Sequence, residues 1–98
     1  CFNDLMAIGA LNLLNRNGIL VPKDMSIAGF DNITISGYTT PPLTTFDQPK
    51  RRIGAEAADM LLNLIQSPDK IQNEGQLSRV LHGTLLARES TSPPSIKE

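Results

Sequence analysis

The clearest pattern near the start of the chain is an apolar helix over residues 5–16. At a rotation of about 100° per residue, one broad arc is filled by apolar side chains, namely Met6, Ala7, Ala10, Leu11, Leu13 and Leu14. Asn3 or Asp4 suits the N-cap, because its side-chain oxygen can accept a hydrogen bond from an amide of the first turn. Gly18 suits the left-handed position that ends the helix. The arc is wider than one sheet contact needs, so we expect this helix to touch a second surface.

Extended segments are predicted on both sides of the next loop. Residues 25–30 form a short apolar run that predicts a buried strand ending at Asp31, and residues 43–46 predict another strand. The stretch 32–42 between them is rich in Thr, Ser, Gly and Pro and is expected to be a loop. The chain opens on Cys1 as if inside a strand, so the order strand, helix, strand predicts a right-handed parallel βαβ unit.

A second amphipathic helix is predicted over residues 50–65. Its apolar residues recur at helical spacing, namely Ile53, Ala57, Met60, Leu61, Leu64 and Ile65. Pro49 precedes the helix, and the run Ser67-Pro68-Asp69 is expected to end it. Helices that alternate with extended segments indicate the α/β class.

The last third of the chain predicts a polar connection followed by extended structure. Residues 69–76 are expected to form a surface connection. Strand candidates follow at 77–81 and 84–88, interrupted at Gly83. The Ser- and Pro-rich tail from Ser90 is expected to be frayed.

Composition and charge narrow the possible classes. Apolar residues make up 40% and charged residues 19% of the 98-residue chain, which is typical of globular protein. The net charge is -1 and no basic stripe exists, so we expect no direct nucleic-acid contact by this segment. Cys1 is the only cysteine, and no cysteine or histidine pair has metal spacing, so we expect no metal and no cofactor. No apolar run approaches the roughly 20 residues that span a bilayer, and we expect no membrane contact.

Short polar side chains follow the first two predicted strands. Asn3 and Asp4 follow the first strand, and Asp31 follows the second. Ligands of open α/β sheets bind beyond the carboxyl ends of the strands, where these groups could bond hydroxyls or ring nitrogens of a small polar ligand. The alternative is structural: Asn3 or Asp4 caps the helix, and Asp31 begins an Asx turn. The pattern alone leaves both open.

Catalytic chemistry has little support in the sequence. His82 has no Ser, Cys or carboxylate partner at a recognisable spacing, and Cys1 has no supporting base. Lys50-Arg51-Arg52 could contact phosphate, but a solvated first helical turn explains it as well. We therefore expect that the chain is not an enzyme.

Four motifs in order resemble the C-terminal part of LacI/GalR-type transcription regulators. They are CFNDLMAIGA at 1–10, GILVPKDMSIAGFDN at 18–32, Pro41-Pro42-Leu43-Thr44-Thr45 with Gln48-Pro49 and Gly54, and Arg88-Glu89-Ser90-Thr91. The resemblance covers nearly the whole chain, and the ordered set makes a chance match improbable. One motif alone would be weak.

The resemblance implies a parallel-sheet, type I periplasmic-binding-protein-like domain of two α/β subdomains, of which this chain is a C-terminal fragment. Residues 1–45 would belong to the C-terminal subdomain. Residues 46–76 would form a crossover and a helix of the N-terminal subdomain, 77–91 the terminal strands and 92–98 the tail. The implied hinge or crossover residues are Thr45, Phe46 and Gln48.

The resemblance also implies roles for individual residues. An effector, either a small sugar or a nucleobase, would contact Asp31, Asn3 and Asp4. The wide apolar arc of the first helix and the loop after Asp31 would contribute to a homodimer interface, with candidate residues Met6, Ala10, Leu13 and Tyr38.

The resemblance further implies that the protein is a cytoplasmic repressor. It would bind operator DNA only through an N-terminal helix-turn-helix that is absent from this chain. The competing interpretation is a periplasmic sugar-binding protein of an uptake system, which shares the fold. The motif at 41–45 with Gln48-Pro49 favours the regulator. The sequence does not identify the effector.

Overall fold

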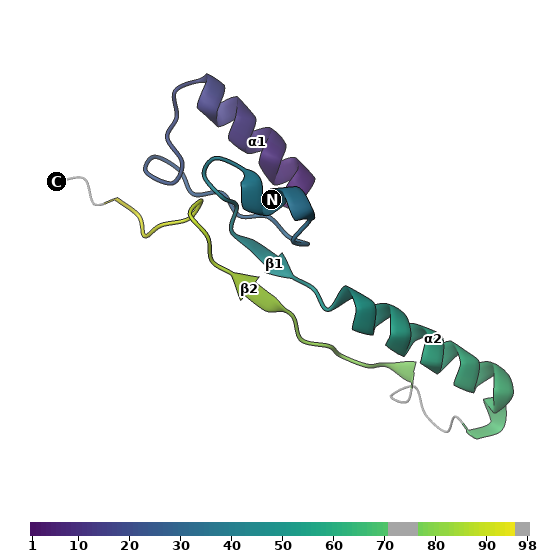
Figure 1. Ribbon diagram of the computed structural model, residues 1–98. Helices are drawn as coiled ribbons and strands as arrows, with labels where there is room; N and C mark the ends of the chain where they lie inside the picture. Colours follow the sequence, from purple (N-terminus) through teal and green to yellow (C-terminus); the bar gives the residue numbers. More distant parts are fainter. Residues whose placement is uncertain (71–76, 96–98) are drawn as a thin grey trace. The chain divides into compact units, whose positions relative to one another are not determined.

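The computed structural model describes residues 1–70 and 77–95, which fall into two compact units. Unit 1 comprises residues 1–48 together with the chain from Thr84 onward, and unit 2 comprises Pro49–Gly83 (Figure 1). Among the described residues, no helix has both the length and the apolarity that a bilayer crossing needs.

Unit 1 begins with helix α1, Asp4–Arg16. Asn3 is its N-cap, and its side-chain oxygen accepts a 2.9 Å hydrogen bond from the amide of Met6. Gly18 follows the helix with a φ of 70°, a left-handed conformation that glycine adopts without strain. The predicted helix is therefore confirmed, with its cap and its terminating glycine.

Three extended segments of unit 1 lie side by side. The amino group of Cys1 and the amide of Asp4 donate to the carbonyls of Ala28 and Phe30, at 2.7 and 3.1 Å. Ala28 in turn forms a parallel bridge with Thr44, which joins the second extended segment to the third. The predicted βαβ unit concerns the first and second segments, which make the two backbone hydrogen bonds from Cys1 and Asp4.

The buried strand expected at residues 25–30 is wrong in two respects. Only Ala28 makes a β-bridge, and both Met25 and Phe30 are exposed. Side chains alternate along an extended segment, and Gly29 faces Asp4 of α1. Phe30 therefore lies on the opposite side, where α1 does not cover it.

A short antiparallel pair completes the sheet of unit 1. β1, Thr45–Asp47, pairs with β2, Thr84–Leu86, so that Thr45 lies opposite Leu86 and Asp47 opposite Thr84. β2 lies within the predicted segment 84–88, and β1 overlaps the predicted segment 43–46 and continues to Asp47. The expected loop 32–42 contains a short 3₁₀ helix, η1, Thr34–Tyr38.

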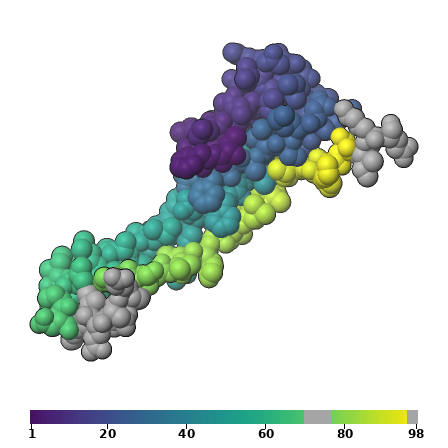
Figure 2. Space-filling model, turned by 180° about the vertical axis from the view of Figure 1, so that it is seen from behind, coloured from purple at the N-terminus to yellow at the C-terminus, as the bar shows by residue number. Residues whose placement is uncertain are grey.

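The chain after β2 is held against unit 1, so the expected fraying from Ser90 is wrong. Ser90 is fully buried, and its hydroxyl accepts from the amide of Thr44 at 2.8 Å and donates to the carbonyl of Ile27 at 2.5 Å. Ser92 continues the contact, because its amide donates to the Ser26 hydroxyl at 3.1 Å. In Figure 2 this yellow segment lies against the blue surface of unit 1. Paired polar groups, and not apolar side chains, fix the segment.

The core of unit 1 contains more buried polar residues than buried apolar ones. The buried apolar residues are Ala7, Leu11 and Leu43, and the buried polar residues are Asp4, Ser36, Thr44, Thr45 and Ser90. No buried side-chain nitrogen or oxygen in the described part of the chain lacks a hydrogen-bond partner. Pairing removes the penalty of burying these groups, so the core is specified by hydrogen-bond geometry as well as by packing.

Unit 2 is built on helix α2, Lys50–Gln66, and the 3₁₀ helix η2, Pro68–Lys70. The predicted helix is confirmed, yet none of its residues is buried. Residues 77–81 form no strand, contrary to our prediction, and most of the expected connection 69–76 lies outside the described residues.

One charged cluster links α2 to the later part of unit 2. The guanidinium of Arg79 forms ion pairs with Glu56 and with Asp59, the latter at 3.3 Å. The hydrogen bond that Arg79 donates to Glu56 raises the pKa of Arg79 above its ordinary value, and the bond to Asp59 adds to the effect. Arg79 and Asp59 are exposed and Glu56 is half-buried, so the cluster orders surface side chains and forms no core.

Candidate functional site

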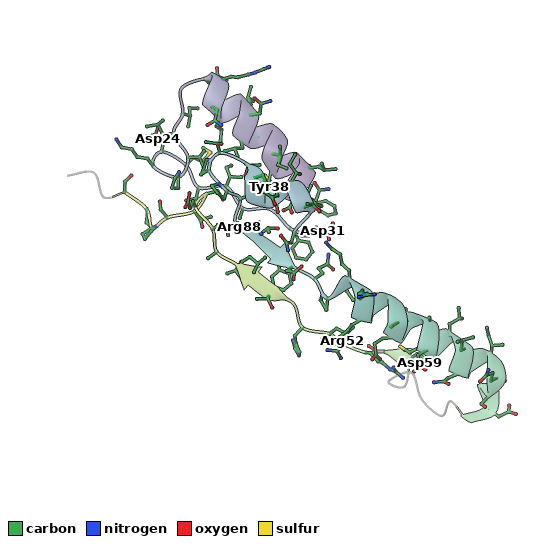
Figure 3. The ribbon with its side chains drawn as sticks, viewed as in Figure 1. Asp24, Asp31, Tyr38, Arg52, Asp59 and Arg88 are labelled. Atoms are coloured by element: carbon green, nitrogen blue, oxygen red, sulfur yellow. The ribbon has the colours of Figure 1, made fainter. Side chains whose placement is uncertain are left out.

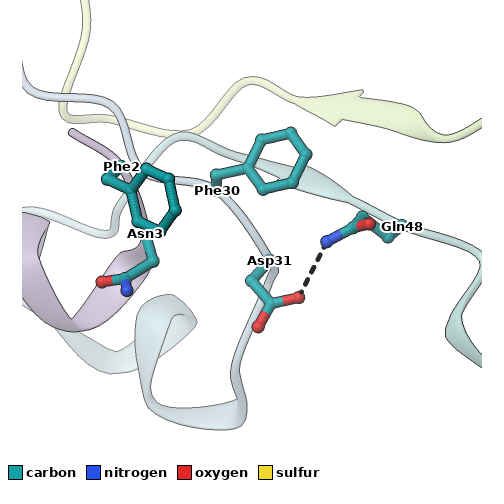
Figure 4. Close-up of a pocket in the computed structure, with 5 residues that line it drawn as sticks. All are labelled: Phe2, Asn3, Phe30, Asp31 and Gln48. Atoms are coloured by element: carbon teal, nitrogen blue, oxygen red, sulfur yellow. Dashed lines mark hydrogen bonds between the residues drawn. The ribbon is translucent and has the colours of Figure 1, made fainter.

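A pocket of about 500 Å³ lies in unit 1, beyond the ends of the parallel extended segments. Its lining residues are Phe2, Asn3, Phe30, Asp31 and Gln48 (Figure 4). The volume falls within the range of small-molecule sites, roughly 300–1,000 Å³. The pocket combines two phenylalanine rings with three polar side chains, which suits a ligand with an apolar face and a polar edge.

Asp31 is held in an unusual backbone conformation. Its φ is 119° and that of Asn32 is 52°, both in the region that residues with a side chain rarely adopt. The Asp31 amide donates to the carbonyl of Phe46 at 2.9 Å, and its carboxylate accepts from the Gln48 side chain at 3.2 Å. Such strain persists only where neighbours fix it, and it concentrates at binding sites.

Aromatic rings form the apolar part of the site. Phe30 stacks on Phe46 of β1 with ring centroids 5.3 Å apart and an interplanar angle of 6°. Phe2 is almost fully exposed beside the pocket. A ring already fixed by stacking offers a flat surface to a planar or ring-shaped ligand at little entropic cost.

Asn3 serves the helix and the pocket together. Its side-chain oxygen accepts the α1 cap bond from Met6, so the structural alternative is correct for that atom. An asparagine amide also carries two N–H donors. Asn3 also lines the pocket, so the helix cap and the candidate site share this residue.

Asp4 does not line the pocket. It is fully buried, and its two carboxylate oxygens accept from the Thr45 hydroxyl at 2.6 Å and from the Ile33 amide at 2.9 Å. A side chain added at Gly29 would lie 2.2 Å from Asp4 Oδ1, so the carboxylate fits only because Gly29 has none. We expected Asp4 beside an effector; the structure gives it a place in the scaffold.

Gln48 lines the pocket although we did not predict it there, and the same holds for Phe2 and Phe30. Gln48 was expected only as a crossover residue, together with Thr45 and Phe46, which lie in β1. Gln48 follows β1 as Asp31 follows its own extended segment, and the same strand-end argument could have found it. It is also the last residue of unit 1 before the chain enters unit 2.

Three of the four residues predicted for a dimer interface are exposed. Met6 and Leu13 of α1 are 57% and 62% exposed, and Tyr38 of η1 is 82% exposed, whereas Ala10 is half-buried. Tyr38 is labelled in Figure 3. Asn15 of α1 donates to the carbonyl of Thr40 at 3.3 Å, which ties the helix to the segment after η1. His82 and Cys1 are exposed, and no metal-binding cluster occurs within 1–70 and 77–95.

Comparison with known proteins gives a consistent match. A family model described as "Periplasmic binding protein-like domain" matches residues 1–91. The "HTH-type transcriptional repressor PurR" of Aliivibrio fischeri (strain MJ11) is 49% identical over 69 residues, covering 70% of this chain and 20% of the relative. The protein of the same name from Vibrio parahaemolyticus is 51% identical over 69 residues, covering 70% and 21%. The chain thus spans about a fifth of the length of these curated relatives.

Solved structures share the fold over more than nine-tenths of this chain. A putative transcriptional regulator LacI from Bacillus cereus subsp. cytotoxis gives a TM-score of 0.83 at 31% identity, covering 93% of this chain and 31% of that one. A LacI family transcriptional regulator from Enterococcus faecium, with bound ribose, gives 0.79 at 36%, covering 96% and 34%. The lac repressor dimer bound to operator and the anti-inducer ONPF gives 0.78 at 34%, covering 92% and 30%.

Proposed function

Because this chain belongs to the periplasmic binding protein-like domain family, we propose that it forms the effector-binding and dimerisation portion of a ligand-responsive, DNA-binding repressor. The resemblance to LacI/GalR-type regulators is confirmed by the relatives and structures it matches. Curated relatives named transcriptional repressors favour this function over a periplasmic uptake protein. The proposed role is one of binding without a catalytic step, in the cytoplasm, with operator contact made by another part of the protein.

The subdomain assignment belongs to the same proposal. Unit 1 would be part of the C-terminal subdomain and unit 2 part of the N-terminal subdomain. Thr45, Phe46 and Gln48 lie just before the chain passes into unit 2 and would form one crossover.

The observation that carries the effector role is the fixed carboxylate of Asp31 at the pocket. It faces a site that also presents the Gln48 and Asn3 amides and two phenylalanine rings. This combination suits a small ring with hydroxyl or N–H groups on one edge, such as a sugar or a nucleobase. Neighbouring structures described with ribose, lactose and cellobiose support the sugar class.

Calorimetry on the intact protein tests this role. Ribose, lactose, cellobiose and free nucleobases are titrated separately into the wild type, Asp31→Asn and the control Asp24→Asn. Asp24 lies in an exposed turn outside this pocket. Loss of a charged acceptor costs about 1.5–3 kcal/mol, or ten- to a hundredfold in affinity. Unchanged affinity in a folded Asp31→Asn protein would contradict the effector role.

The homodimer is proposed to use the exposed apolar face of α1 together with Tyr38. A two-fold contact buries the same patch in both copies, so a single substitution acts twice. Leu13→Glu removes about 1.5–3 kcal/mol of apolar burial per copy and adds a charge that must be desolvated. Sedimentation should show monomers for Leu13→Glu and dimers for Asn12→Glu, a control on the polar side of α1. A dimeric Leu13→Glu protein would place the interface elsewhere.

A further inference from the structure

The turn that carries Asp31 needs support from outside its own backbone. Asp31 and Asn32 are consecutive residues with φ values of 119° and 52°, and neither is glycine. Their amides are anchored on β1, Asp31 to the Phe46 carbonyl at 2.9 Å and Asn32 to the Thr45 hydroxyl at 3.2 Å. Residues in sparsely populated backbone regions stay there only when the surroundings over-determine them.

The side chain of Asn32 supplies the remaining contacts of this turn. Its oxygen accepts from Arg88 Nη2 at 2.9 Å and from the Ser36 hydroxyl at 3.3 Å. Its NH₂ group donates to Asp47 at 3.3 Å. The bond from Arg88 is the shortest of the three and carries the donor's charge, so it contributes most to fixing Asn32.

Arg88 is itself fixed by the segments it joins (Figure 3). Its Nη1 donates to the carbonyl of Leu43 at 3.0 Å and to the Ser36 hydroxyl at 2.9 Å, and its backbone amide donates to the Thr44 hydroxyl at 3.0 Å. The planar guanidinium thus bonds Asn32 before η1, Ser36 within it and Leu43 after it. A lysine ammonium cannot reproduce this geometry. Arg88 follows β2 in the chain, far from Asp31 in sequence.

We propose that Arg88 is a positioning residue for the effector site: by holding the Asn32 side chain, it fixes the turn that presents the Asp31 carboxylate to the pocket. The inference rests on the effector-binding function proposed above. Arg88 does not line the pocket, so it acts through Asn32 and not by touching the ligand.

Hydrogen exchange tests the positioning without any ligand. The intact protein is compared with Arg88→Gln, Arg88→Lys and Arg79→Gln, a control that removes the same charge in unit 2. Peptides that contain Asp31 and Asn32 should exchange about tenfold faster in both Arg88 variants, with the peptides of α1 unchanged. The control should alter neither. If the α1 peptides exchange faster by the same factor, Arg88 merely stabilises unit 1 as a whole, which would overturn the proposal. Unchanged exchange in the peptides of the turn would overturn it as well.

Effector affinity tests the route through Asn32. Ribose, lactose and cellobiose are titrated separately into the wild type, Arg88→Gln, Asn32→Gly and the double variant. Glycine accepts the left-handed backbone but removes the side chain. Arg88→Gln should weaken binding about tenfold in the wild-type background and less than twofold in the Asn32→Gly background. The same loss in both backgrounds would overturn the proposal. If no sugar binds the wild type, the proposed sugar function fails, and hydrogen exchange still decides the positioning.

Discussion

Unit 1 and unit 2 obtain their stability in different ways. All buried residues of the described chain lie in unit 1, where each buried polar side chain has a hydrogen-bond partner. In unit 2, α2 repeats leucine and isoleucine along its length, yet none of its residues is buried. Unit 1 is stabilised by hydrogen bonds among its own buried polar groups. Helix α2 of unit 2 has no such burial, so its stability depends on further contacts to its apolar side chains.

This difference shows that the apolar periodicity of a helix does not determine how much its packing stabilises it. α1 and α2 were predicted with equal ease from apolar periodicity, and both form. Helices of this length are marginal in water without tertiary packing. Side-chain substitutions inside unit 1 should therefore have large effects, and matched changes on α2 small ones.

The largest expected effect comes from removing the buried carboxylate of Asp4. Asp4→Ala leaves the buried Thr45 hydroxyl and the part-buried Ile33 amide without their acceptor. An unsatisfied buried donor costs about 1–3 kcal/mol, so unit 1 should lose about 2–6 kcal/mol. The free energy of unfolding of unit 1 is measured in a urea titration, in which hydrogen exchange of unit 1 peptides reports the unfolding. Asp59→Ala on α2, whose side chain is 60% exposed, should change little. Equal losses would refute the contrast between the units.

A matched pair of glycines sharpens the contrast. At Gly29 an added Cβ would lie 2.2 Å from Asp4 Oδ1 and 3.2 Å from the Asp4 Cα, so Gly29→Ala should destabilise unit 1 by about 1–3 kcal/mol. At Gly54 nothing lies within 4 Å, and alanine favours a helix interior by about 0.5–1 kcal/mol. Thermal unfolding should therefore shift in opposite directions for the two variants. A shift in the same direction would show that the two environments are alike.

The smallest expected effects concern the helix starts. Asn3→Ala removes the α1 cap and should cost about 1 kcal/mol, while Asn3→Ser keeps it. At α2 the N-cap is Pro49, with no side-chain cap bond. Pro49→Ser adds a cap worth about 1 kcal/mol, but it raises the entropy of the unfolded chain by an amount worth about 0.4–1 kcal/mol, so a net gain in stability of at most about 0.6 kcal/mol is expected. Hydrogen exchange of the first-turn amides measures the stability change at each helix start. A larger change at α2 than at α1 would contradict the prediction that the side-chain cap matters more at α1.

Local signals predicted the helices well, because their causes are local. The Asn3 cap, the left-handed Gly18 and the ends of α2 all follow from residues within one or two turns. The exposure of Phe30 was missed, because it depends on which side of the segment α1 covers. The burial of Ser90 was missed for a similar reason: its partners, Ile27 and Thr44, are 63 and 46 residues away.

The candidate site was predicted in part by the strand-end argument. That argument placed Asn3 and Asp31 near one another, and both line the pocket. It could not separate Asn3 from its neighbour Asp4, which is fully buried, because the difference lies in the room left by Gly29. Nothing local marks Arg88 as a support of the site, since its bond to Asn32 joins residues 56 positions apart.

The buried Ser90 also sets the order of events when the protein is made. Residues 1–48 emerge from the ribosome first, but the contacts of Ile27 and Thr44 with Ser90 cannot form until all of unit 2 has been synthesised. At roughly 5–20 residues per second, that wait is on the order of 2–8 seconds. Helix α1 forms within microseconds. During synthesis, the nascent chain therefore carries a formed α1 for seconds before the contacts of Ser90 with Ile27 and Thr44 can close unit 1.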